Sequence, residues 1–325
     1  MCKPWGVAVE TIHFSDPACP WAYSASPALA GLRWRFGDQL DWRLVTIGLS
    51  ESTEAYERFG YTPARAAQGN RRFRRYGMPM ATAPRERLAA SGRACRAIVA
   101  TRLHEPAREY DAFRALQFAV FTTTLLLDTD DAIREALRAV PGLDQDAIVA
   151  AIEDADVEEA YQRDREETRR AAGSPTEAQG KATDRGGGVV RYTAPSLIFR
   201  DNGRTLEAGG FQPLEAYDVV LANLDPTLTR RSTPDSPLAI LEALPYAATT
   251  QEVARCMADG NEAPDRAATE DALIELTGEG EVRRTPLGDD ALWSLAGRAD
   301  QAVGAATSGA GAAAGDSSKA SAISS

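Results

Sequence analysis

Histidine and cysteine are scarce in this sequence. Its 325 residues include two histidines, His13 and His104, and four cysteines. The cysteines stand at positions 2, 19, 95 and 256, so no pair has the Cys-x2-Cys spacing typical of a zinc site. Four scattered cysteines also do not make the dense framework of a small disulfide-bonded domain. We therefore expect free thiols, no metal ion and no tightly bound cofactor.

Long apolar runs and lysine are also missing. No stretch of eighteen apolar residues occurs, which argues against a transmembrane helix. The first residues turn polar too early for a signal peptide. Lysine occurs three times, and 36 basic against 47 acidic residues give a net charge of −11. Without a membrane span or a signal peptide, we expect a cytoplasmic protein that does not bind a membrane. Because an acidic protein repels phosphate backbones, we do not expect it to bind nucleic acid.

What the sequence does contain is a globular composition, with 44% hydrophobic and 26% charged residues. Residues 7–14 and 41–49 have strand character, and a helix is predicted between them at 22–36, which makes a βαβ unit. A long helical block follows. It starts with an Arg-rich segment at 63–76, and apolar residues then recur at helical spacing at 85–103, 107–126, 129–140 and 145–170.

The following segment returns to strands. A loop rich in Gly and Ser is predicted over 171–188, and strands at 196–200 and 205–208 flank an Asn-Gly turn. A helix at 212–223 completes a βαβ, helical block, ββα order. That order predicts an α/β thioredoxin-like fold over residues 1–224, with a helical insertion at about 52–172.

A smaller unit is expected after a polar linker at 225–236. The sequence predicts helices at 237–244 and 264–277, and between them a helix with a capping box from Thr249 to Glu252. A final pair of strands completes the pattern, which is typical of a winged-helix-like α+β domain over 237–297. The unit has four basic and twelve acidic residues up to Gly297, the wrong balance for DNA. The Ala-, Gly- and Ser-rich tail at 298–325 is predicted to be disordered.

The strongest chemical signal is the segment Asp16-Pro-Ala-Cys-Pro-Trp-Ala-Tyr23. Cys19 stands between a predicted strand and a predicted helix, where helix amides stabilise an anion. We therefore expect a thiol pKa below the free value of about 8.5. His13 is a candidate ion partner or a residue of the sheet face, and Asp16 is expected to cap the helix.

This segment resembles the active-site segment of the DsbA family, especially its FrnE-like cytosolic branch. The resemblance covers roughly residues 7–223, and Thr193-Ala194-Pro195 is similar to the family's cis-proline segment. It implies that Cys19 is the attacking thiol and that Pro195 is a cis-proline placed against it. It also implies that Ala194 pairs with an extended substrate and that Pro20 and Trp21 shape the rim.

The sequence departs from the family at Ala22, where the second cysteine of the active site is replaced. A dithiol enzyme uses that cysteine to resolve a mixed disulfide. The remaining chemistry is that of one thiol. We expect an oxidoreductase or isomerase that acts on a protein or small-molecule thiol or disulfide. A low-molecular-weight thiol such as glutathione is its candidate cofactor. Cys95 and Cys256 are expected in the core, although Cys95 or Cys2 could resolve from a distance.

Two other functions stay open. The segment also resembles kappa-class glutathione transferases and 2-hydroxychromene-2-carboxylate isomerases, which carry a serine at the position of Cys19. Alternatively, the chain is a non-catalytic DsbA-like adaptor that binds a protein partner. The basic cluster formed by Arg71, Arg72, Arg74 and Arg75 is a candidate site for an anion or such a partner, or simply a solvated helix face. The oligomeric state is not indicated.

Overall fold

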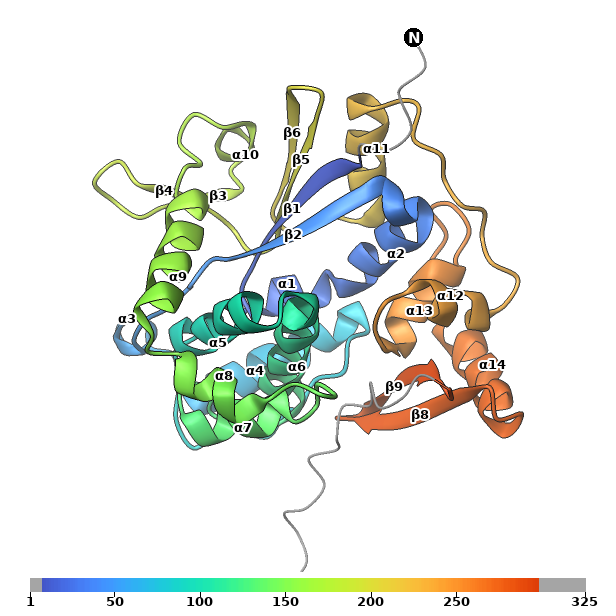
Figure 1. The fold of residues 1–325 in the computed structure, drawn as a ribbon, viewed down its shortest axis with the longest axis horizontal. Coiled ribbons are helices and arrows are strands. Elements are labelled where there is room, and N and C mark those ends of the chain that lie inside the picture. Colours follow the sequence, from blue (N-terminus) through green and yellow to red (C-terminus); the bar gives the residue numbers. More distant parts are fainter. Residues whose placement is uncertain (1–7, 298–325) are drawn as a thin grey trace, which may run out of the picture.

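A central sheet organises the molecule. The computed structural model describes residues 8–297, and its largest sheet has the strand order β2-β1-β5-β6 (Figure 1). Strand β1 is parallel to β2, whereas β5 is antiparallel to both β1 and β6. The bounds are β1 (Val9–Ser15), β2 (Leu40–Thr46), β5 (Ser196–Asp201) and β6 (Arg204–Gly209). The predicted thioredoxin-like sheet is confirmed.

The β5–β6 hairpin turns at the predicted Asn-Gly pair. Asn202 and Gly203 have φ angles of 47° and 75°. A tight hairpin turn of this kind requires positive φ at both central residues, and Asn and Gly tolerate that region best. The turn therefore fixes the register that pairs Ser196 with Gly209 at the far end of the hairpin.

Alternate residues of the strands enter different clusters on the two faces of the sheet. Helices α2 (Ser26–Phe36), which follows α1 (Pro20–Ser24), and α11 (Leu214–Leu224) cover one face. Leu197 and Phe199 of β5 pack there with leucines of both helices. Ile198, between them, joins Ile12, Phe14 and Cys19 in a separate cluster. This period of two is what a strand buried on both faces requires.

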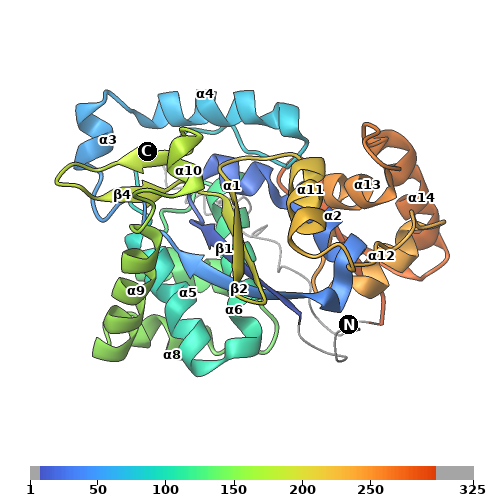
Figure 2. The same cartoon turned by 90° about the horizontal axis from the view of Figure 1, so that it is seen from above.

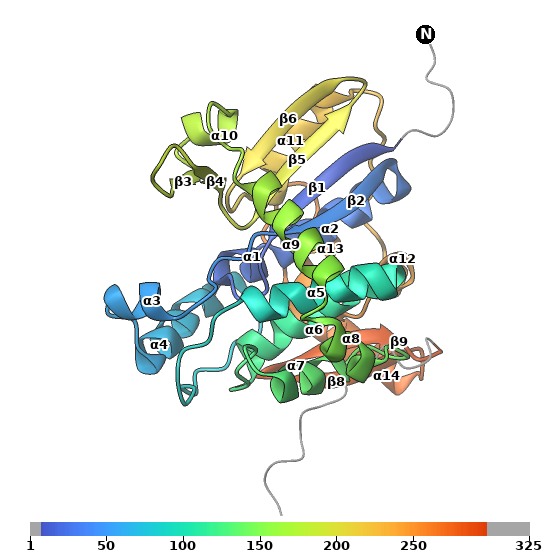
Figure 3. The ribbon, with the colours of Figure 1, turned by 60° about the vertical axis from the view of Figure 1, so that its left-hand side comes forward.

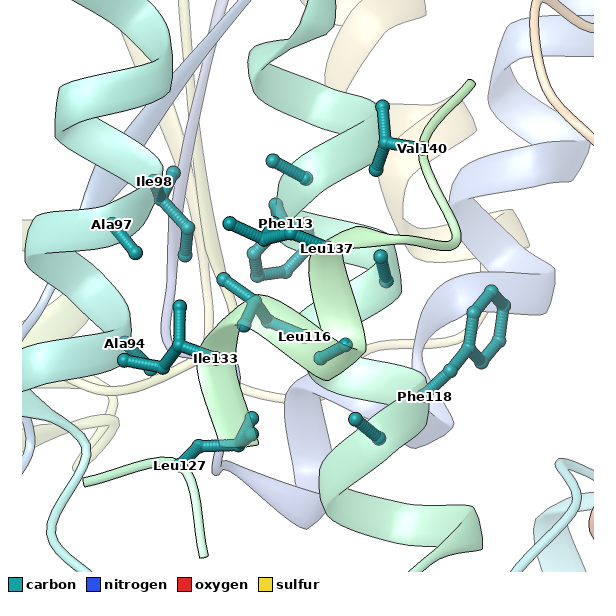
Figure 4. Packing of buried hydrophobic residues seen from close by; sticks show 14 of the residues in the cluster. Ala94, Ala97, Ile98, Phe113, Leu116, Phe118, Leu127, Ile133, Leu137 and Val140 are labelled. Atoms are coloured by element: carbon teal, nitrogen blue, oxygen red, sulfur yellow. The ribbon is translucent and has the colours of Figure 1, made fainter. Parts of the chain in front are cut away.

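The helical insertion has its own core, in which Ile98 of α5, Leu116 of α6 and Ile133 of α7 pack together (Figure 4). Its helices start at clear signals, such as Thr62 capping α4 just before Pro63 and Asp144 capping α8. The bounds are α3 (Glu54–Arg58), α4 (Pro63–Phe73), α5 (Gly92–His104), α6 (Glu109–Thr122), α7 (Asp130–Leu137), α8 (Gln145–Ala151) and α9 (Ala155–Thr168), with 3-10 turns η1 (Gly37–Gln39), η2 (Arg74–Tyr76) and η3 (Pro106–Arg108).

Three predicted segments differ from the structure. The predicted helix over 145–170 is interrupted, because α9 restarts from Asp154, whose backbone is extended. Helix α5 begins at Gly92 and not at residue 85. The predicted loop over 171–188 contains α10 (Pro175–Ala178), capped by Ser174, and β3 (Ala182–Asp184), which pairs with β4 (Val190–Tyr192).

The C-terminal unit has helices and a small sheet in the predicted order. The sheet order is β7-β9-β8, and Thr249 and Glu252 form the predicted capping box. Figure 2 shows α13 beside α2, and Figure 3 shows the β8–β9 hairpin at the same end of the molecule as α7 and α8 of the helical insertion. The bounds are α12 (Pro237–Ala243), β7 (Ala248–Thr249), α13 (Thr250–Met257), α14 (Arg266–Gly278), β8 (Val282–Leu287) and β9 (Asp290–Leu295).

This unit packs closely against the rest of the chain. Ala30 of α2 lies in the same buried cluster as Val253 and Trp293 of the unit. Arg114 of α6 forms a buried, bidentate ion pair with Glu252 of α13, with distances of 2.7 and 3.0 Å. The segment predicted as a linker is also attached, since the amide of Arg231 donates to the carbonyl of Arg35.

Candidate active site

Cys19 lies at the end of the turn that joins β1 to α1. It is the N-terminal cap residue of α1, and Pro20 occupies the first helical position, where its missing N–H costs nothing. The Cys19 thiol donates to the carbonyl of Ala194 at 3.3 Å. The Ala194–Pro195 bond is cis, as predicted. The fold therefore brings together two residues that are 175 positions apart in the sequence.

The expected low thiol pKa is wrong. Cys19 is only 6% exposed, and burial raises the pKa of its thiol to about 12. The amides of Ala22 and Trp21 hydrogen-bond the sulfur and lower the pKa, as the position at a helix start predicts. Burial outweighs them because a thiolate loses its hydration there, and the nearby Asp16 raises the pKa further. The resting Cys19 is a neutral thiol.

Asp16 connects three segments and does not cap α1. Its Oδ1 accepts from the amide of Ala18 at 2.9 Å, while Oδ2 accepts from the amide of Leu49 at 2.8 Å and the hydroxyl of Ser91 at 2.9 Å. The carboxyl is fully buried, and burial raises its pKa. The turn that carries Cys19 is thus fixed to the chain after β2 and to the start of α5.

The other described cysteines are buried, as predicted. Cys95 belongs to the core of the insertion, and its thiol donates to Oδ2 of Asp16 at 3.5 Å. Burial raises the pKa of Cys95 well above its ordinary value. Cys256 is buried in the cluster of the C-terminal unit. Cys2 lies outside the described residues.

His13 is not an ion partner of Cys19. Its ring lies edge-on to Trp42 and Phe113, with centroid distances of 6.5 and 6.0 Å. Burial, together with the charge of Arg33, lowers its pKa to about 3, so the imidazole is neutral at physiological pH. Alternation along β1 explains this, because His13 and Phe14 point to opposite faces of the sheet and Phe14 shares the cluster of Cys19.

An aromatic surface lies beside the site. Trp21 is 41% exposed and contacts Phe73, Tyr76 and Phe211 at centroid distances of 4.8 to 5.8 Å. We call these four side chains the aromatic rim. Sequence reasoning identified Trp21 but missed Phe211, which follows the turn after β6. Its place after the Gly209-Gly210 pair, in the same half of the fold as Pro195, is the signal that was available.

The arginine cluster is only partly a free surface. Arg74 donates to the carbonyl of Met80 and pairs with Asp289 of the C-terminal unit at 2.9 Å. Arg75 donates to the hydroxyl of Tyr76 at 2.8 Å. Arg71 and Arg72 are exposed on α4. Of these four arginines, Arg74 therefore contributes to the packing of two parts of the chain, and a shared anion or partner site stays a prediction.

Within residues 8–297, no helix combines the length and the apolar character needed to cross a bilayer. Comparison with known proteins agrees with the fold. A candidate protein disulfide isomerase from Nitrosomonas europaea is 15% identical, with a TM-score of 0.50, and the match covers 67% of this chain and 97% of that one. A candidate DsbA oxidoreductase from Streptomyces coelicolor is 18% identical, with a TM-score of 0.49 and coverages of 70% and 94%. The cytosolic disulfide reductase DsbM from Pseudomonas aeruginosa, also solved with GSH, is 17% identical, with a TM-score of 0.46 and coverages of 66% and 99%.

No curated protein matches the sequence. The model of the DSBA-like thioredoxin domain matches residues 11–181, which is just over half of the chain and includes the Cys19 turn and the helical insertion. DsbA-family oxidoreductases are enzymes of thiol-disulfide exchange. By its fold and by this match, the chain belongs to the family of DSBA-like thioredoxin domains.

Proposed function

We propose that the protein is a cytoplasmic thiol-disulfide oxidoreductase or isomerase that works through Cys19 alone. The observation that carries this proposal is the 3.3 Å contact between the Cys19 thiol and the carbonyl of Ala194, next to cis-Pro195. Cys19 also stands at a helix start with two amides directed at its sulfur. We further propose the FrnE-like branch as its place in the family, with the C-terminal unit as a winged-helix-like appendage.

The proposed reaction has two exchange steps. In the first, Cys19–SH and R–S–S–R give the mixed disulfide Cys19–S–S–R and R–SH, and the proton of Cys19 passes to the released thiolate. In the second, an external thiol R′–SH attacks the R sulfur, which restores Cys19–SH and releases R–S–S–R′. The external thiol replaces the cysteine that is absent at position 22. A low-molecular-weight thiol such as glutathione fits this role.

The raised thiol pKa sets the timing of these steps. A neutral thiol attacks slowly, because the thiolate is the nucleophile. Once formed, a mixed disulfide at Cys19 is also slow to break, because a thiol of high pKa is a poor leaving group. We therefore propose a long-lived mixed disulfide. The backbone of Ala194 pairs with the bound substrate, and Pro20 together with Trp21 of the aromatic rim contacts its side chains.

The test is to incubate the protein with glutathione disulfide at pH 8 and pH 9 and to identify the modified peptide by mass spectrometry. We expect one glutathionyl adduct on Cys19, formed faster at pH 9 and persisting after excess disulfide is removed. Cys95→Ser retains the adduct and Cys19→Ser abolishes it. An adduct that depends on Cys95 and not on Cys19 contradicts the proposal.

Ala22→Cys is the matched gain-of-function variant. The new thiol attacks the sulfur of Cys19, forms an intramolecular disulfide and releases reduced glutathione. This exchange consumes one disulfide and forms another, so it needs no external oxidant or reductant. We expect the lifetime of the adduct to fall at least tenfold. An unchanged lifetime, with the variant folded, would mean that the adduct does not form in this turn.

A second function is favoured by the neutral state of Cys19. The serine of kappa-class transferases and 2-hydroxychromene-2-carboxylate isomerases stabilises a bound thiolate through its hydroxyl. A protonated Cys19 can donate a hydrogen bond in the same way, without repulsion between two anions. This alternative predicts that reduced glutathione binds to Cys19→Ser as tightly as to the wild type and that no adduct forms. Calorimetry on both proteins distinguishes the two.

A further inference from the structure

A polar cavity lies between the sheet, the helical insertion and the C-terminal unit. Its volume is about 250 Å³, and its walls include His13 of β1, Arg33 of α2, Trp42 of β2 and Tyr110 of α6. Tyr246, from the chain between α12 and β7, closes the side formed by the C-terminal unit. Cys19 is not among the lining residues. This junction cavity is therefore separate from the exchange site.

The cavity contains polar side chains that the described chain leaves without partners. His13 is 2% exposed, yet neither of its ring nitrogens has a hydrogen-bond partner among residues 8–297. The indole nitrogen of Trp42 and Nε of Arg33 are likewise buried and unpaired within that range. Buried polar groups are almost always hydrogen-bonded in folded proteins. Three such groups lining one cavity indicate that something else supplies the partners.

Charge indicates which kind of partner is missing. The other charged side chains that line the cavity have their own ion pairs, since Arg43 pairs with Glu167 at 2.6 Å and Glu109 with Arg102 at 2.6 Å. Asp111 pairs with Arg108 at 3.4 Å. Arg33 is different, because its buried Nε has no hydrogen-bond partner among residues 8–297 and its guanidinium is stacked on aromatic rings. Arg33 therefore brings a positive charge to the cavity wall whose Nε donor is still unpaired.

The walls restrict the rest of the ligand. The guanidinium of Arg33 lies 4.0 Å from the ring centre of Trp42 and 4.6 Å from that of Tyr110. Aromatic and proline side chains dominate the remaining wall, including Pro106 and Pro245. Pockets for drug-sized ligands have volumes of roughly 300–1,000 Å³, so 250 Å³ admits about one ring. The donors of Arg33 and Trp42 match a carboxylate, which only accepts hydrogen bonds.

We propose that the junction cavity binds a small organic carboxylate with a single aromatic or apolar ring. Its carboxylate pairs with Arg33 and accepts from the indole of Trp42, while His13 contributes one further hydrogen bond. The ring lies against Tyr110 and Tyr246. This binding function is independent of the thiol chemistry at Cys19.

Benzoate and its neutral analogue benzamide test the proposal on the full-length protein. The probe is the indole region of a ¹H–¹⁵N spectrum, with the Trp42 signal assigned from Trp42→Phe. Benzoate shifts this signal saturably. The indoles of Trp34 and Trp293 stay in place, because their N–H groups are bonded to Ser232 and Thr250. Benzamide binds at least tenfold more weakly.

Arg33→Gln lowers the benzoate affinity at least tenfold, whereas Arg138→Gln leaves it within twofold. Arg138 is an exposed arginine at the end of α7, so this control makes the same change in net charge away from the cavity. If Arg33→Gln does not fold, the comparison of benzoate with benzamide on the wild type decides. Equal affinities, or no movement of the Trp42 signal, mean that water alone fills the cavity and overturn the proposal.

Discussion

At the scale of single residues, the position of Cys19 has two opposite effects on the pKa of its thiol. The start of α1 directs two amides at the sulfur, which favours the thiolate. The contacts that bring Ala194 to the same sulfur also exclude water, which disfavours it. The second effect is larger, and the thiol pKa is about 12. Reactivity at this site therefore depends on a substrate or a rearrangement that hydrates the sulfur.

The first prediction concerns the alkylation of Cys19. Iodoacetamide should modify Cys19 slowly at pH 8, and the rate should still be rising at pH 10, because the thiolate is scarce until the pH approaches about 12. In urea the same peptide should titrate near the free value of about 8.5. Peptide mass spectrometry measures both. A rate that levels off below pH 9 in the folded protein contradicts the burial argument.

The second prediction concerns Asp16. Burial raises its pKa, so the folded chain holds the proton more tightly than the unfolded chain, and folding stability falls as the pH rises through the interval between the two pKa values. Asp16→Asn should cost about 1–3 kcal/mol near pH 4, because the amides of Ala18 and Leu49 then compete for one oxygen.

Because Asn does not titrate, the deficit of Asp16→Asn should shrink as the pH is raised from 4 to 8. Urea denaturation at several pH values measures it, with Asp131→Asn, an exposed acid of α7, as the control. A deficit that is constant with pH would show that the carboxyl has the same pKa in the folded and unfolded chains.

At the scale of elements, the ion pair between α6 and α13 is the most buried one described. The side chains of Arg114 and Glu252 are 5% and 0% exposed. Glu252 is also the third residue of α13 and the last residue of its capping box, so one carboxylate stabilises the helix start and the contact between helices. Such a pair adds little net stability over an apolar contact, but removing one partner leaves a buried charge alone.

The third prediction follows from that asymmetry. Glu252→Gln keeps an acceptor for the capping box but leaves Arg114 as an uncompensated buried cation. We expect a loss of about 3–5 kcal/mol in the free energy of unfolding. Glu159→Gln removes the exposed partner of Arg163 and should cost less than about 1 kcal/mol. Urea denaturation compares the two, and equal losses would mean that water reaches the buried pair.

Local sequence patterns predicted most helices and strands but not how deeply their side chains are buried. The capping box located the start of α13, and Asn202-Gly203 located the hairpin, whereas the single helix predicted over 22–36 is divided into α1 and α2. The burial of Cys19 depends on Tyr192 and Ala194, about 170 residues away, which no local pattern relates to it. The role of His13 was similarly ambiguous, because alternation places its side chain on one face of the sheet without showing which residues pack there. Only the structure shows that His13 lies against Phe113 of α6.

At the scale of the whole molecule, the C-terminal unit behaves as part of one body. Its cluster includes Ala30, its Glu252 neutralises Arg114, and Asp289 accepts from the amide of Met80. The boundaries at 225–236 and 237–297 stay predictions from sequence. Contacts of this kind couple the unfolding of the two parts, because separating them exposes apolar surface and an unpaired charge.

The fourth prediction is a single cooperative thermal transition for the full chain in scanning calorimetry. A fragment ending at Asp225 should melt at a lower temperature or fail to remain in solution, since it leaves Arg114 without Glu252. The Glu252→Gln variant of the full chain should also melt in one step, at a lower temperature. Two separate transitions in the wild type would mean that the C-terminal unit unfolds on its own.

The hydrogen bonds that Ala18, Leu49 and Ser91 donate to Asp16 constrain how this fold can be recombined. The acceptor lies in the first βα turn, whereas its donors include Leu49 after β2 and Ser91 at the entrance to α5. A chimera that exchanges the helical block between relatives at residue 52 would separate Ser91 from the carboxylate it serves. A compatible crossover transfers residues 16, 49 and 91 together, so the active-site turn and the insertion are inherited as one module.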